Sequence, residues 1–136
     1  MLKVIKNQKY QTCGEVKKAA ALGRRYAILS SIRHWNELAT APVKDLTAVR
    51  RLLGLSVSEC ALCERYDSQC YNCPLYGALG LVKCYESGQL YAKAFTIFSR
   101  LIGSGGNYST KAEKDAAVKR FRRIAEKMVK VLEGLL

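Results

Sequence analysis

The chain has 136 residues, of which 49% are hydrophobic and 25% are charged, a composition typical of one globular domain and not of a disordered segment. Its 23 lysines and arginines against 11 aspartates and glutamates give a net charge of +12, which favours nucleic acid, an anionic membrane surface or an acidic protein as partner. No apolar stretch is long enough to span a bilayer, and the first residues lack the apolar run of a signal peptide. We therefore expect a single domain over residues 1–136, soluble and cytoplasmic.

The first part of the chain predicts helices after a short polar start. Residues 1–12 are rich in lysine and predict a tail or one short strand, and residues 15–54 are helical. Apolar residues recur at steps of three and four over 15–39, which predicts one long core helix with two neighbouring stripes: Leu22, Tyr26 and Leu29, and Ile28, Ile32, Trp35 and Ala39. Pro42 suits the first turn of a second helix that ends at Gly54, with the apolar residues Leu46, Val49, Leu52 and Leu53.

Residues 56–86 hold five of the six cysteines and predict a knuckle. The spacing of Ser56 and Glu59 fits a capping box, so Cys60 and Cys63 are expected three residues apart at the opening of a helix, facing the same way. Residues 67–80, with one proline and two glycines, predict a loop.

Residues 87–136 predict two more helices separated by a flexible joint over 103–109. The first runs from about Gln89 to Ile102, with the inward residues Leu90, Ala94, Ile97, Phe98 and Leu101. Thr110 and Glu113 form a capping box for the second, whose apolar stripe is Ala117, Phe121, Ile124, Met128, Val131 and Leu135, widened by Val118, Ala125 and Leu132. The expected fold is therefore all-α, a compact bundle of about four to five helices with a central cysteine knuckle.

The cysteine spacing predicts a zinc site. Two C-x2-C steps, Cys60 with Cys63 and Cys70 with Cys73, can bring four thiolates to one tetrahedral Zn²⁺. Cys84 is an alternative fourth ligand in place of Cys70 or Cys73, or a buried thiol. An iron–sulfur cluster and disulfides are the alternatives to zinc. Cys13 lies far away in the sequence and is expected to act as a small hydrophobic residue.

The charges are segregated around this knuckle. Residues 1–58 carry eleven basic and three acidic side chains, a net +8, and residues 87–136 carry ten and four, a net +6. Residues 59–86 carry two basic and four acidic side chains, a net −2, and a zinc ion with four thiolates would add two further negative charges. Nucleic acid is therefore expected to contact the helices that flank the knuckle, and zinc is expected to brace the fold.

The candidate phosphate contacts lie on these flanking helices, where cations bind the backbone with little sequence preference. They are Lys17, Lys18, Arg24, Arg25, Arg50, Arg51, Lys119, Arg120, Arg122, Arg123, Lys127 and Lys130. The same charges also fit an ordinary solvated surface or a helix lying on a membrane. The heptad spacing of the last helix offers a different function, docking on an acidic host protein or on a second copy of the chain.

The residues of hydrolytic and phosphate-binding enzymes do not assemble in this sequence. His34 is the only histidine, and on a helix beside Trp35 it is expected to be a packed or half-exposed polar residue and not a ligand. No Ser/His/Asp set or carboxylate pair is found, and the glycines at 103–106 lack the lysine of a P-loop. We expect no enzyme activity and no small-molecule substrate.

The motif that starts at Ser31-Ile-Arg-His34-Trp35 and continues with Cys60-Ala-Leu-Cys63, Cys70-x2-Cys73-Pro74 and Cys84 resembles small proteins carried by phages and other prokaryotic viruses. The likeness covers roughly residues 26–90, and members often follow the last cysteine with Thr-Pro, where this chain has Tyr85-Glu86. That group has no established activity. The resemblance implies a small basic viral regulator in the host cytoplasm, and a hyperthermophilic host in which disulfides would survive is compatible with it.

Overall fold

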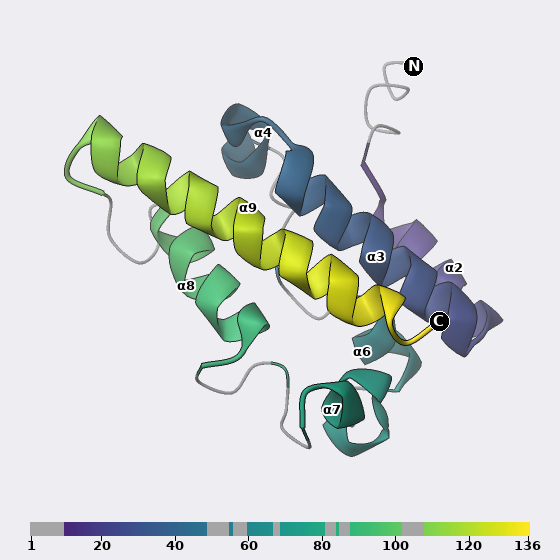
Figure 1. Cartoon of the computed structure of the whole chain (residues 1–136). Coiled ribbons are helices and arrows are strands. Elements are labelled where there is room, and N and C mark those ends of the chain that lie inside the picture. The colour runs from purple at the N-terminus through teal and green to yellow at the C-terminus, as the bar shows by residue number, and fades with distance from the viewer. Residues whose placement is uncertain are drawn as a thin grey trace, which may run out of the picture.

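The structure is a computed structural model that describes residues 10–48, 55, 60–66, 69–80, 84, 88–101 and 108–136. In these residues the chain is helical and forms no strand, which confirms the all-α class. The elements are α2 (Cys13–Leu22), α3 (Arg24–Thr40), α4 (Val43–Ala48), α6 (Ala61–Arg65), the 3₁₀ turn η2 (Cys70–Asn72), α7 (Pro74–Ala78), α8 (Leu90–Leu101) and α9 (Lys111–Glu133). Figure 1 shows α9 and α3 side by side, with α8 beneath α9 and the short helices α6 and α7 at one edge.

The predicted helix over 15–39 is two helices. A capping box begins α2, since the Thr12 hydroxyl accepts a hydrogen bond from the Glu15 amide and the Glu15 carboxylate accepts one from the Thr12 amide. The helix ends at Gly23, whose φ of 141° and ψ of 177° form a conformation open almost only to glycine. The prediction of one continuous helix was wrong because a glycine inside a periodic pattern does not reveal the backbone angle it will take.

The break at Gly23 also changes which stripe is buried. Leu22, Tyr26 and Leu29 are 58%, 52% and 39% exposed, so their predicted place in the core was wrong. The buried face of α3 runs instead through Ala27, Ile28, Ser30, Ser31, His34, Trp35, Leu38 and Ala39. After the turn, α3 packs against α9, α2 and α6.

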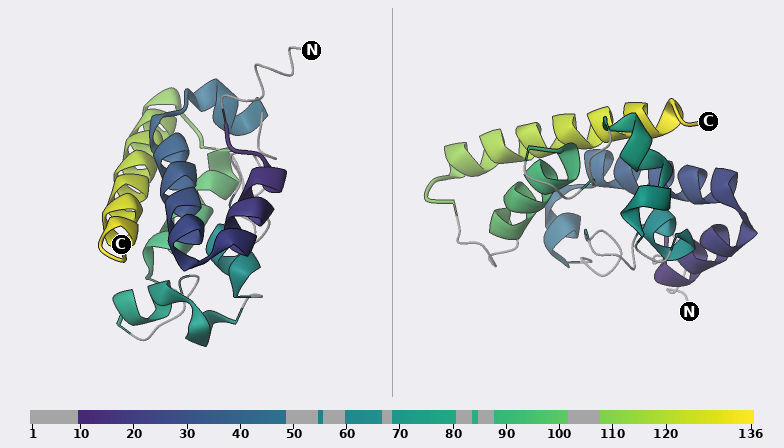
Figure 2. Two further views of the ribbon diagram at one scale, coloured as in Figure 1. Left: turned by 90° about the vertical axis from the view of Figure 1, so that its right-hand side faces the viewer. Right: turned by 90° about the horizontal axis from the view of Figure 1, so that it is seen from below.

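The helices α3 and α9 are antiparallel neighbours. Arg24, at the start of α3, donates a 3.3 Å hydrogen bond to the carbonyl of Leu135, just after α9, and Arg122 donates one of 2.9 Å to the carbonyl of Ala41, just after α3. Figure 2 (left) shows α3 between α9 and α2. This middle position explains why α3 buries residues on a broad face.

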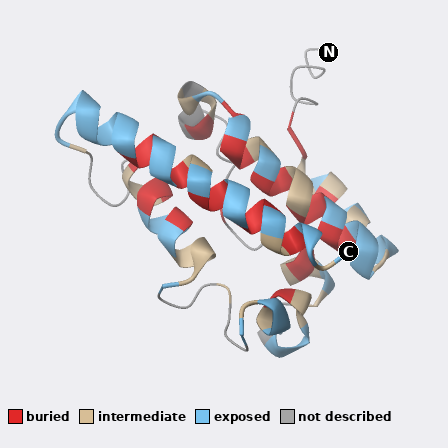
Figure 3. Ribbon diagram, viewed as in Figure 1, coloured by how far each residue is buried: buried red, intermediate tan, exposed pale blue. Residues whose placement is uncertain are grey.

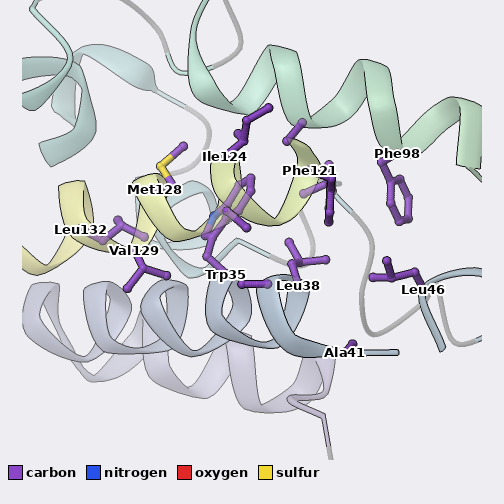
Figure 4. Close-up of a cluster of buried hydrophobic side chains, with 14 of the residues drawn as sticks. Trp35, Leu38, Ala41, Leu46, Phe98, Phe121, Ile124, Met128, Val129 and Leu132 are labelled. Atoms are coloured by element: carbon purple, nitrogen blue, oxygen red, sulfur yellow. The ribbon is translucent and has the colours of Figure 1, made fainter. Parts of the chain in front are cut away.

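Side chains of α3, α8 and α9 fill the core between these helices (Figure 4). Phe98 of α8 stacks on Phe121 of α9 with ring centroids 6.1 Å apart, and Trp35 of α3 meets Tyr91 of α8 edge-on at 6.3 Å. The Tyr91 hydroxyl also donates to the carbonyl of Leu55. The three helices therefore share one core.

The predictions for the two last helices are confirmed. α9 begins with the Thr110–Glu113 capping box, and its apolar face is buried against α3 and α8 while its opposite face is exposed (Figure 3). The buried residues of α9 are Ala117, Val118, Phe121, Ile124, Ala125, Met128, Val129 and Leu132, and Val131 and Leu135 are half-buried. On α8, Ala94, Ile97, Phe98 and Leu101 are buried and Leu90 is half-buried.

The segment predicted as a loop over 67–80 contains two short helical turns, η2 and α7. Pro74 occupies the first turn of α7, where its missing N–H costs nothing. The helix that follows Pro42 is present as α4, with Leu46 buried. Several predicted segments fall wholly or partly outside the described residues: 1–9 of the tail or strand predicted over 1–12, residues 49–54, the capping box at 56–59, and 103–107 of the joint predicted over 103–109. At the described end of the first of these, Tyr10 and Gln11 are buried and form no strand.

Candidate metal centre and basic surface

The first C-x2-C step lies at the opening of α6, as its spacing predicts. Cys60 is the N-cap residue, with φ −117° and ψ 109°, and Cys63 lies in the first turn. The neighbouring Cys63 thiol is the main cause that lowers the pKa of Cys60 to about 7, against the opposing effect of burial. The backbone amides of Cys63 and Leu62 also lower the pKa of Cys60. The Cys60 side chain makes no capping hydrogen bond of ordinary length and angle. The lowered pKa favours the thiolate form of Cys60.

Cys73 and Cys84 lie within electrostatic reach of this pair. The pKa of Cys63 is raised by its interaction with the Cys60 sulfur, by burial, and by the negative charges of Cys60, Cys84 and Cys73. Cys73 is the N-cap residue of α7, and both Cys73 and Cys84 are half-buried and packed against the hydrophobic core. Thiols from two other segments thus act electrostatically on Cys63.

These thiols do not form a closed metal site as they are placed. Among the described residues, no group of three or more His, Cys, Asp and Glu side chains is arranged to hold a metal ion, and Cys13, Cys60, Cys63, Cys73 and Cys84 carry reduced thiols. The side chain of Cys70, a predicted ligand, lies outside the described part.

Ser31 is a neighbour of Cys60 that the sequence did not reveal. The residue is 2% exposed, its hydroxyl oxygen makes no hydrogen bond of ordinary geometry with any described residue, and it lies close enough to Cys60 to lower the pKa of that thiol. A serine on the apolar face of a helix was the only signal available. His34, one turn later, is 4% exposed and meets Trp35 edge-on at 6.3 Å, so it is packed as expected.

The outer face of α9 carries the clearest basic surface. Lys119, Arg120, Arg123, Lys127 and Lys130 are all exposed, and the ion pairs found in the described residues do not include them. Lys111, by contrast, pairs with Asp115 at 3.0 Å in the first turns of the helix. We call these five cations the α9 basic stripe.

The other predicted phosphate contacts have mixed positions. Lys17 and Lys18 on α2, and Arg24 and Arg25 at the start of α3, are exposed. Arg122 is half-buried and its guanidinium bonds the carbonyl of Ala41, so it serves the packing of α3 on α9. Arg50 and Arg51 lie outside the described residues.

Comparison with known proteins identifies no relative. No protein-family model, curated protein or solved structure matches the chain. The resemblance to viral proteins therefore stays a prediction. None of the helices described is long and apolar enough to cross a membrane.

Proposed function

We propose that this chain is a non-enzymatic, zinc-stabilised helical protein that binds nucleic acid through the α9 basic stripe and the start of α3. The observation that carries the proposal is the set of five exposed cations on one face of α9, none of which is neutralised by a described acidic group. An unpaired cation on a rigid helix can replace the counterions of a phosphate, and the released counterions drive binding.

The dimensions of the stripe fit a nucleic-acid backbone. From Lys119 to Lys130 a helix rises about 16 Å, close to the length of five base pairs at about 3.4 Å each. Because α3 and α9 are antiparallel, Arg24 lies near the end of α9, and it extends the positive surface beyond the stripe. Contacts of this kind position a protein on phosphates without reading bases, so we propose largely non-specific binding.

The cysteine segment, residues 59–86, stabilises the fold in this proposal and does not contact nucleic acid. Residues 59–86 carry a net charge of −2, and zinc held by four thiolates adds two more negative charges, so this edge repels phosphate. Its role is to brace the short helices α6 and α7, which have few residues to bury. A structural zinc ion contributes directly to folding.

The competing interpretation, docking through the heptad face of α9, has less surface to use. Phe121, Ile124 and Met128 are buried against α3 and α8 of the same chain, so a partner could reach them only by displacing those helices. An acidic protein would have to use the same basic stripe as nucleic acid does.

Binding to a short DNA duplex over a salt series tests the nucleic-acid part. Four or five phosphate contacts predict a fall of log K with log salt of slope about −4. The double variant Arg123→Glu, Lys127→Glu should weaken binding strongly and flatten the slope. The control Lys111→Glu, Lys114→Glu makes the same change in net charge on the same helix outside the stripe. A salt-independent affinity, or an equal loss in both variants, contradicts the proposal.

Elemental analysis of protein purified without added metal tests the zinc part. We expect a colourless protein with one zinc per chain. Iron in its place would indicate an iron–sulfur cluster, and a metal-free protein with no reactive thiols would indicate disulfides; either result refutes the zinc brace and leaves the basic stripe to be judged by the DNA measurement.

A further inference from the structure

We infer that the end of the bundle at which α2 joins α3 docks on the surface of an anionic lipid bilayer. We call this surface the α2–α3 tip. It consists of Lys18, Leu22, Arg24, Arg25, Tyr26 and Leu29. The inference goes beyond the proposed function because it assigns a second partner to the chain. The tip shares Arg24 with the nucleic-acid surface, but the α9 basic stripe is not part of it.

Three large apolar side chains are exposed at this tip. Leu22, Tyr26 and Leu29 are three of the six large hydrophobic residues that are exposed in the described part of the chain, and they lie within eight positions. Tyr26 and Leu29 are three apart on α3 and share its outer face, while Leu22 ends α2 before the turn at Gly23. Figure 2 (right) shows this turn at one end of the bundle. Exposed apolar residues gathered in one place are typical of an interaction site.

Each leucine of the tip has an exposed cation on its own helix. Lys18 precedes Leu22 by four residues on α2, and Arg25 precedes Leu29 by four residues on α3, a spacing that places both members of each pair on one helix face. Residues 16–32 contain four basic residues and no acidic one. The apolar side chains are therefore bordered by positive charge.

The neighbouring helix ends leave the tip positive. Arg65 of α6 is exposed and donates a 2.8 Å hydrogen bond to the carbonyl of Ala20, in the last turn of α2. The end of α9 lies beside Arg24. The acidic residues on these two ends are Glu64 and Glu133. Five cations of α2, α3 and α6 thus stand against two carboxylates.

An anionic bilayer matches both the apolar and the charged part of the tip. Leucine side chains enter the boundary between headgroups and acyl chains, tyrosine is favoured at that boundary, and the cations bind anionic headgroups. A second copy of the chain would bring the same cations face to face, which is repulsive. Nucleic acid would use the cations, but aliphatic side chains offer it neither stacking nor hydrogen bonds. A bilayer therefore accounts for all the side chains of the tip.

Cosedimentation with lipid vesicles tests the apolar contribution. We expect the protein to bind vesicles made of equal parts of phosphatidylserine and phosphatidylcholine and to bind pure phosphatidylcholine much more weakly. The variant Leu22→Gln, Tyr26→Gln should bind the anionic vesicles at least about 10-fold more weakly. The control Tyr71→Gln, Phe95→Gln removes two exposed hydrophobic side chains outside the tip and should bind as the unaltered protein does. Circular dichroism checks that both variants keep their helices. No binding to the anionic vesicles, or an equal loss in both variants, overturns the inference.

The charged contribution is tested on the same vesicles. Since each cation near an anionic surface strengthens binding about fivefold, Lys18→Glu, Arg25→Glu should weaken it at least about 25-fold. The control Lys111→Glu, Lys114→Glu changes the net charge equally, about 30 Å away along α9, and should lose much less. Equal losses would mean that net charge, and not the tip, governs binding.

Insertion is measured with lipids that carry bromine on their acyl chains, which quench tryptophan fluorescence. The native Trp35 is 5% exposed, so the unaltered protein should be quenched little and Leu22→Trp strongly. Equal quenching of the two proteins contradicts insertion of the tip. DNA affinity separates this inference from the proposed function: Leu22→Gln, Tyr26→Gln should leave it unchanged, and a loss of DNA affinity that matched the loss of vesicle binding would assign the tip to nucleic acid instead. A protein that binds DNA but no vesicles refutes this inference alone.

Discussion

The guanidinium of Arg122 donates a 2.9 Å hydrogen bond to the carbonyl of Ala41, 81 residues earlier in the chain. Ala41 is the C-cap residue of α3, and the last carbonyls of a helix have no partner inside it. A cation at this end also opposes the helix dipole. Arg122, which belongs to α9, thus caps the C-terminal end of α3. Its neighbour Arg123 is exposed in the α9 basic stripe.

Replacing these two arginines one at a time should separate an effect on the free energy of unfolding from an effect on DNA affinity. Arg122→Met leaves the Ala41 carbonyl without its donor and should lower the free energy of unfolding by about 1–2 kcal/mol, with DNA affinity nearly unchanged. Arg123→Met should change stability by no more than about 0.5 kcal/mol and weaken binding at low salt. Urea denaturation and the DNA salt series check both. Equal effects of the two variants on either measurement would show that the residues share one role.

Gly23→Ala should destabilise the protein, because alanine is strained at a φ of 141° whatever the space around it. The expected loss is about 1–3 kcal/mol in the free energy of unfolding. Gly77 lies inside α7, and a Cβ there meets nothing within 4 Å, so Gly77→Ala should stabilise by about 0.4–1 kcal/mol. Thermal unfolding should move the two midpoints in opposite directions. A neutral Gly23→Ala would argue that the junction of α2 and α3 relaxes to other angles.

Phe121→Ala should remove the largest of the fully buried side chains, which is stacked on Phe98. A cavity of this kind costs about 3–5 kcal/mol. Phe95 on α8 is 50% exposed, and Phe95→Ala should cost at most about 1.5 kcal/mol for its stacking on Tyr91. Chemical denaturation measures both. If Phe121→Ala retained full stability but changed the oligomeric state, the heptad face would be an interface and not a core.

The carboxylate of Glu15 should make a small contribution to stability that depends on pH. The Thr12 amide donates to it at 2.9 Å and Arg33 lies 3.3 Å away; these contacts lower the pKa of Glu15 below 4.5. Because the pKa in the folded state is the lower one, the stabilisation is complete above pH 4.5 and is lost as the pH falls further. Its side chain is 43% exposed, so solvent screening limits the gain to about 0.5 kcal/mol.

Glu15→Gln keeps an acceptor for the Thr12 amide but removes the charge. Unfolding free energies of both proteins between neutral pH and about pH 3 should therefore differ most near neutrality and converge in acid. A difference that stayed constant over this range would mean that the capping hydrogen bond, and not the charge, accounts for the effect.

Local signals were sufficient for the end of the chain and misleading near its start. Thr110 and Glu113 mark the beginning of α9, and one unbroken stripe marks its buried face, so both could be predicted. Over α3, two stripes fit the helical period equally well. Whether the stripe of Tyr26 or that of Ile28 is buried depends on where α9 lies. The spacing of residues along one helix does not indicate contacts with a distant segment.

The same distinction holds for the candidate site. The predicted place of Cys60 and Cys63 at the opening of a helix agrees with α6, and two residues three apart share a helix face. The effect of Cys84 on the pKa of Cys63 and that of Ser31 on the pKa of Cys60 join parts of the chain that are far apart in sequence, and no motif indicates them. Thr12 and Glu15 have the spacing of a capping box in the sequence, and this local signal marks the start of α2 at Cys13.

The pairing of α3 with α9 also sets the order in which the nascent chain can complete its core. The residues of α9 follow the end of α3 by about 70 positions, a delay of roughly 4–14 s at translation rates of about 5–20 residues per second. During that time Trp35 and Leu38 have left the ribosome, but the α9 side chains that bury them have not yet been synthesised. Expression of this protein should accordingly be sensitive to chaperone supply, and more so at temperatures at which exposed apolar helices aggregate quickly.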